Sequence, residues 1–260
     1  MSVIQFCLRQ KYKGLKGNVD LLFDDHFNEV ITRSSYVFVF IMISTLITFF
    51  YLNPTLELLK TPIRNIKFFQ ISPSEYIVST IKVCFYIGLL VSIPVGLSQL
   101  ILFLSPGLSI IERSSISILI ICSFLLFILG LFFSFFLLVP AALSFFLVYT
   151  STIIEPFWSF IDYLEFVLSL ILMSGFIFQL PILQIILSFA KILDPTEMIN
   201  FGPYMLIWSV IIAAIITPSA DPITQILLAG ALFSLYMSGA ILSKILQDEI
   251  RKKRAEIKLK

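Results

Sequence analysis

The sequence predicts an all-α protein that crosses a membrane six times, and three observations lead to this prediction. Apolar residues occupy 58% of the 260 positions, and the mean hydropathy is +1.01. Charged residues make up 13%, about half of the roughly 25% usual in soluble domains. The apolar residues also gather in runs near the length of about 20 residues that a helix needs to cross the hydrocarbon layer. A soluble core could not bury this much apolar surface, so the surroundings of the chain are lipid.

Each of six apolar runs is expected to form a spanning helix. The runs cover residues 36–52, 80–104, 115–148, 166–190, 203–217 and 223–243. Pro94 lies inside the second run and Pro181 inside the fourth, while Pro140 is expected to kink or end the long third run. The fifth run has only 15 residues, so we expect either local thinning of the bilayer or shielding by neighbouring helices.

The segment before the first run has the pattern of an amphipathic helix. Apolar residues recur at helical intervals within residues 19–31, and acidic and amide residues lie between them. We expect this helix to lie along the membrane interface on the side of synthesis, called the cis side. Three regions follow: a cis tail (1–35), a six-span membrane domain (36–245) and a basic cis tail (246–260).

The distribution of Lys and Arg predicts that both termini lie on the cis side. With this orientation the cis segments hold fourteen basic residues, and the trans segments hold three, Lys60, Arg64 and Lys67. Positive flanks are retained on the side of synthesis. The net charge is only +2, so we expect the basic tails to touch anionic lipid headgroups, not nucleic acid. Lys82, at the outer end of the second span, can snorkel to the interface.

Residue types that support enzymatic chemistry are scarce. The chain has one histidine, His26, and three cysteines, Cys7, Cys84 and Cys122, whose spacing fits neither a metal site nor a disulfide framework. It contains no nucleotide-binding loop, HExxH or GxSxG motif. We therefore predict a protein that is not an enzyme and uses no cofactor. The N-terminus lacks the apolar region of a signal peptide, and none is expected.

Two acidic residues form the candidate binding site. Glu29 precedes the first span, and Glu112 lies in the loop between the second and third spans. At the cis interface a carboxylate can accept paired hydrogen bonds from a guanidinium, so two neighbouring carboxylates could receive two consecutive arginines of a ligand. The alternative is structural: Glu29 pairs with Arg33 one helical turn later, and Glu112 caps or neutralises its own loop.

Four polar residues, Gln99, Gln179, Asp221 and Gln225, lie within or beside the spans. Polar residues at membrane depth usually face protein or water. We expect the amide of Gln179 to help satisfy the backbone carbonyl that Pro181 frees, and Asp221 to cap the sixth helix. The glutamines are expected to join helices. A transport path through Gln99, Gln179 and Asp221 stays an alternative.

Three stretches resemble the TatC family, the multispanning receptor subunit of the twin-arginine protein translocase. They are HFNEV before the first span, SIPVGLSQLILFLSPGLSIIER across the second span and its loop, and ITPSADPITQILLAG at the fifth turn and sixth span. The second stretch is the most specific. Its residues with the family's spacing are Pro94, Gln99, Phe103, Pro106, Gly107 and Glu112.

The resemblance implies a concave bundle of six helices with both termini on the cis side. It implies that Glu29 and Glu112 bind the arginine pair in signal peptides of folded cargo. It also implies single-span partners of the TatA and TatB type, and transport driven by the proton-motive force instead of nucleotide. Association with further copies of the chain stays open.

Composition points to a compartment. The high Phe and Ile content and the missing targeting peptide favour a plastid thylakoid membrane, with a bacterial plasma membrane or a mitochondrial inner membrane as alternatives.

The chain departs from the family's pattern at three places. Ile31 stands where the family usually has Arg, Gln179 where it usually has Glu, and the loop INFGPYM lacks an expected Arg pair.

Two other function classes stay open. A secondary transporter or ion channel needs an ionisable relay inside the bilayer. A scaffold or membrane insertase is expected to carry an intramembrane Arg, and none lies in the six runs.

Overall fold

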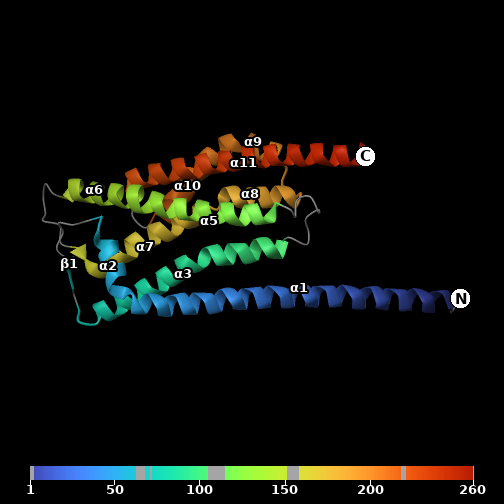
Figure 1. Ribbon diagram of the computed structural model, residues 1–260, viewed down its shortest axis with the longest axis horizontal. Coiled ribbons are helices and arrows are strands. Elements are labelled where there is room, and N and C mark those ends of the chain that lie inside the picture. The colour runs from blue at the N-terminus through green and yellow to red at the C-terminus, as the bar shows by residue number, and fades with distance from the viewer. Residues whose placement is uncertain are drawn as a thin grey trace.

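The computed structural model describes residues 3–62, 68–70, 72–104, 115–150, 158–217 and 221–259, with side chains from residue 27 to 252 except 149 and 150. Long helices run along one common direction (Figure 1). The helices are α1 (Val3–Phe50), α2 (Leu52–Lys60), α3 (Glu75–Leu104), α5 (Ile116–Phe133), the π-helix η2 (Ser134–Leu138), α6 (Val139–Thr150), α7 (Phe160–Ile177), α8 (Leu180–Phe189), α9 (Pro195–Asn200), α10 (Gly202–Ile216) and α11 (Pro222–Leu259). The strands β1 (Phe68–Phe69) and β2 (Trp158–Ser159) pair in parallel.

The prediction of an all-α membrane protein is confirmed. Within the described residues, five stretches are long and apolar enough to cross a membrane: Phe27–Phe50, Glu75–Leu104, Ile116–Val148, Phe160–Phe189 and Pro222–Lys252. The short fifth run forms α10, an apolar helix of 15 residues. The N- and C-terminal helices project from the same end of the bundle, which we call the cis end (Figure 1). That there are six crossings, and that this end faces the side of synthesis, stay predictions.

Helix α1 includes both the expected amphipathic segment and the first span. It runs for 48 residues without a break, and residues 18–50 contain neither the Pro nor the Gly that commonly ends a helix. Helix α11 likewise crosses from the last span into the basic tail. The boundaries predicted at residues 35 and 245 therefore fall inside continuous helices, and the interfacial position of the amphipathic segment stays a prediction.

The third span does not end at Pro140, so that part of the expectation is wrong. The helix continues through α6, and a π-turn precedes the proline. In this turn the N–H of Val139 bonds the carbonyl of Ser134, five residues earlier. A proline cannot donate to the preceding turn and crowds its carbonyl, and the wider turn accommodates both effects.

Helices α7 and α8 form the centre of the bundle. Within their most apolar 18 consecutive residues, 67% of the residues are buried. Helix α7 packs against α3 and α5, and α8 packs against α11. The helix is interrupted between Ile177 and Leu180, and Pro181 lies in the first turn of α8. Pro181 therefore does break the fourth span, as its fixed φ and missing N–H predict.

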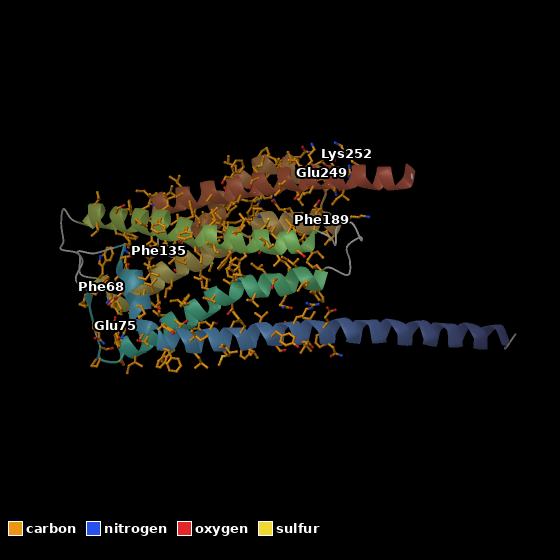
Figure 2. All side chains as sticks on the ribbon, viewed as in Figure 1. Phe68, Glu75, Phe135, Phe189, Glu249 and Lys252 are labelled. Atoms are coloured by element: carbon orange, nitrogen blue, oxygen red, sulfur yellow. The ribbon has the colours of Figure 1, made fainter. Side chains whose placement is uncertain are left out.

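The end of the bundle opposite the cis end is tied together by bonds between distant segments. Figure 2 shows Phe68 and Glu75 at this end, far from Glu249 and Lys252 at the cis end. Ser159 Oγ donates to Glu75 Oε1 at 2.8 Å. Lys82 is not simply extended toward the interface, because its Nζ forms an ion pair with Glu165 of α7. Tyr163 Oη likewise donates to the carbonyl of Leu59 at 2.7 Å.

Candidate functional site

Glu29 binds a guanidinium from its own helix. Its Oε1 accepts hydrogen bonds from Nε of Arg33 at 3.0 Å and from Nη2 at 2.7 Å. The two residues are four positions apart on α1, so their side chains lie on the same face. The side chains are 33% exposed for Glu29 and 27% exposed for Arg33. The structural alternative for Glu29, pairing with Arg33, is therefore what the structure contains.

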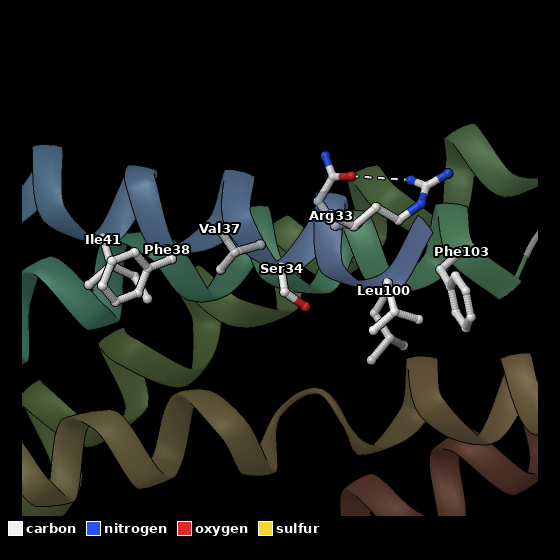
Figure 3. A pocket seen from close by; sticks show the side chains of 10 residues that line it. Arg33, Ser34, Val37, Phe38, Ile41, Leu100 and Phe103 are labelled. Carbon is white, nitrogen blue, oxygen red and sulfur yellow. Dashed lines mark hydrogen bonds between the residues drawn. The ribbon is translucent and has the colours of Figure 1, made fainter. Parts of the chain in front are cut away.

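The same guanidinium also reaches a second helix. Nη1 of Arg33 donates to Oε1 of Gln99 on α3 at 3.2 Å, the bond drawn as a dashed line in Figure 3. The expectation that Gln99 joins helices is confirmed. Arg33 thus connects the carboxylate on α1 to an amide 66 residues later in the chain. Sequence reasoning missed this link because no spacing rule relates two residues so far apart.

A groove between α1 and α3 begins beside this cluster. It has a volume of about 550 Å³, and its walls are mainly apolar. Arg33 and Phe103 lie at one end of the groove, and Phe38 and Ile41 lie at the other (Figure 3). A second hollow of about 250 Å³ shares four of the lining residues and extends toward Phe176 of α7. Two of the candidate residues, Gln99 and Phe103, line the first groove, the one of about 550 Å³.

Helices α1 and α3 approach each other closely at Ser44, Thr45 and Gly88, further along both helices than the groove. Ser44 Oγ donates to the carbonyl of Gly88 at 2.9 Å. A Cβ added at Gly88 would come within 2.9 Å of the backbone of Thr45. Pro94 lies between this contact and Gln99, half-buried inside a helix that continues through it. The glycine is what lets the two backbones meet here.

Glu112 and Pro106 lie outside the described residues, which resume at Ser115. Helix α3 ends at Leu104 and α5 begins at Ile116, both toward the cis end of the bundle (Figure 1). In the sequence Glu112 lies between these two helix ends. Whether Glu112 neighbours Glu29 stays a prediction.

Gln179 is buried and bonds to another helix. Ser123 Oγ of α5 donates to its Oε1 at 2.7 Å, and its Nε2 donates to the carbonyl of Ser123 at 3.1 Å. The expectation that this amide satisfies the carbonyl freed by Pro181 is wrong, because both ends of the amide face α5. The expectation that it joins helices is confirmed.

Asp221 caps α11, as expected. Its Oδ2 accepts the N–H of Thr224 at 3.0 Å and also bonds the hydroxyl of Thr224. Gln225, one turn later, is half-buried. No described hydrogen bond joins Gln99, Gln179 and Asp221, which bond instead to Arg33, Ser123 and Thr224. A transport path through these three residues stays an untested alternative.

A second buried polar set escaped sequence reasoning. Gln184 and Ser188 on α8 and Ser243 on α11 are buried, and their side chains have no hydrogen-bond partner among the described residues. Gly239 of α11 packs directly on α8 beside Gln184.

In the part of the chain that the structure describes, no group of three or more His, Cys, Asp or Glu residues could hold a metal ion.

Comparisons with known proteins agree on one family. The family model described as TatC, Sec-independent protein translocase protein, matches residues 25–230. A tatC-like protein, ycf43, of Trieres chinensis is 44% identical over 85% of this chain and 84% of its own length. The Sec-independent protein translocase protein TatC of Synechocystis sp. is 37% identical over 85% of this chain and 87% of its own.

Solved structures show the same likeness. A crystal structure of the twin arginine translocase receptor TatC superposes with a TM-score of 0.73 at 31% identity, covering 85% of this chain and 98% of that one. A second crystal structure of this receptor, in the detergent DDM, gives a TM-score of 0.75 at 32% identity over 84% and 99% of the two chains. The matched range of the family model includes every candidate site residue.

Proposed function

The chain belongs to the TatC family of Sec-independent protein translocase proteins, and on this premise we propose that it is the subunit that recognises signal peptides carrying an arginine pair. One observation supports this most directly: Glu29 already holds a guanidinium, through two hydrogen bonds to one carboxylate oxygen. A carboxylate in this position can hold the guanidinium of a ligand in the same way.

The surroundings of Glu29 suit an exchangeable ligand. The carboxylate is about one third exposed, so a ligand can reach it from water. Partial removal of water still strengthens its attraction for a cation. In this proposal one arginine of the signal binds Glu29 and the other binds Glu112, and the apolar groove next to Arg33 adjoins the bound pair.

The remaining parts of the proposal follow from family membership. Single-span proteins of the TatA and TatB type assemble with this subunit, and the proton-motive force drives folded cargo across. A plastid thylakoid membrane is the proposed location, supported by the relative from Oryza sativa subsp. japonica that is named TATC, chloroplastic, and is 38% identical over 85% of this chain.

The experiment is photo-crosslinking of an arginine-pair signal peptide to membranes that contain the chain. Glu29→Gln and Glu112→Gln are each expected to weaken binding roughly tenfold or more, because a hydrogen bond to a charged group contributes about 1.5–3 kcal/mol. Glu57→Gln is the matched control, since Glu57 is an exposed glutamate on α2 at the opposite end of the bundle. Undiminished crosslinking in the Glu29→Gln, Glu112→Gln double variant would refute the proposal.

A further inference from the structure

We infer that Arg33 raises the affinity that a ligand needs at this site, by occupying Glu29 until a ligand guanidinium displaces it. The inference rests on the proposed function, because it concerns competition for the same carboxylate. In the structure Nε and Nη2 of Arg33 both bond to Oε1 of Glu29. Arg33 therefore presents to Glu29 the same chemical group, in the same two-pronged contact, that an arginine signal would present.

The pair can be opened by a ligand. Both side chains keep a substantial part of their surface exposed, 33% for Glu29 and 27% for Arg33. Ion pairs of this exposure between residues four apart on a helix are weak. A ligand that offers one guanidinium to Glu29 and a second contact elsewhere therefore has enough advantage to replace Arg33.

Gln99 gives the displaced side chain a second point of attachment. Its Oε1 accepts a hydrogen bond from Nη1 of Arg33 at 3.2 Å, on the side of the guanidinium away from Glu29. Arg33 can therefore release the carboxylate and still be held on α3, at the edge of the groove that both residues line. A guanidinium has enough donors to keep one partner while it gives up another.

Competition of this kind sets a threshold that weakly binding basic ligands do not reach. A resident guanidinium lowers the apparent affinity of every ligand by the fraction of Glu29 that is occupied. A lysine offers a compact charge without the planar fork that matches a carboxylate. Ligands with lysine in place of arginine already bind less tightly, so the same reduction brings their binding below a useful level first.

The test measures the affinity of purified full-length chain in lipid nanodiscs for two synthetic signal peptides, one with an Arg-Arg pair and one with Lys-Lys. Arg33→Gln is expected to tighten binding of the Arg-Arg peptide roughly two- to threefold, and to tighten binding of the Lys-Lys peptide by a similar factor. In the Glu29→Gln background the same change should produce no gain. Arg33→Lys, which keeps the charge but loses the fork, should lie between wild type and Arg33→Gln.

Arg251→Gln is the control for charge. Arg251 is exposed and bonds Gln247 instead of Glu29. In the sequence it lies between Glu249 and Lys252, which Figure 2 shows at the cis end. If removing any positive charge at this end attracts a basic peptide, Arg251→Gln will tighten binding as much as Arg33→Gln, and the inference is overturned.

The two proposals fail in different ways. Weaker or unchanged binding in Arg33→Gln, while Glu29→Gln still lowers affinity, overturns the role of Arg33 and leaves the proposed function standing. Binding of the Arg-Arg peptide that does not depend on Glu29 overturns the proposed function, and the inference falls with it. The melting temperature of each variant in detergent shows whether it is folded.

Discussion

Helix α1 and the α7–α8 pair differ sharply in burial although both are strongly apolar. The most apolar 18 consecutive residues of α1 have a mean hydropathy of 1.8, and 6% of them are buried. Those of α7–α8 have a mean hydropathy of 2.2, and 67% of them are buried. Helix α1 packs chiefly on α3, while α7 and α8 have neighbours on several sides. One element is peripheral and the other central.

The polar bonds of the two regions differ in the same way. Gln179 and Ser174 of the central pair make neutral, buried hydrogen bonds to Ser123 and to the carbonyl of Gly130. The bond between Glu29 and Arg33 on α1 is charged and partly exposed. A buried charge is costly unless paired, and a buried pair does not readily exchange partners. Binding groups are therefore better placed on the peripheral helix, and groups that hold the fold on the central one.

The largest loss of stability is expected when α1 is forced away from α3. Gly88→Leu places a side chain against the backbone of Thr45, which a Cβ would approach within 2.9 Å. Overpacking costs about 1–3 kcal/mol and occasionally more, and we expect the upper end because backbone cannot yield like a side chain. Thermal unfolding in detergent measures the loss. Gly230→Leu is the control, since nothing lies within 4 Å of a Cβ there; equal melting temperatures would show that α1 is not held by this contact.

A smaller loss is expected at the centre. Gln179→Leu removes two hydrogen bonds to Ser123, and the expected cost is about 1–3 kcal/mol because a buried hydroxyl loses its partner. The same unfolding assay compares it with Gln225→Leu, at a half-buried glutamine on α11. An equal stability of the two variants would mean that the bonds of Gln179 contribute nothing specific.

The smallest effect on stability is expected where the effect on binding is largest. Glu29→Gln removes an ion pair between residues four apart, and such pairs contribute about 0.2–0.5 kcal/mol to a helix. A double-mutant cycle with Arg33→Gln measures the coupling directly, and added salt should reduce it. A coupling well above 1 kcal/mol would contradict the view that Arg33 is readily displaced.

Local features of the site were predictable and distant ones were not. The pairing of Glu29 with Arg33 follows from helical spacing, and the cap by Asp221 follows from an acid placed just before a helix. The bonds of Arg33 to Gln99 and of Gln179 to Ser123 were not predictable as pairs, because each partner lies on another helix. The π-turn before Pro140 was also missed, since the sequence shows only that a proline interrupts the pattern of backbone bonds.

The sequence by itself determined which segments are helical and apolar enough to lie in a membrane, because that depends on composition along one short stretch at a time. Only the tertiary structure decided which of these helices is central and which polar side chains meet. The reason is that lipid and protein interior are almost equally apolar. Hydropathy therefore cannot distinguish α1, which faces outward, from α7, which is surrounded by other helices.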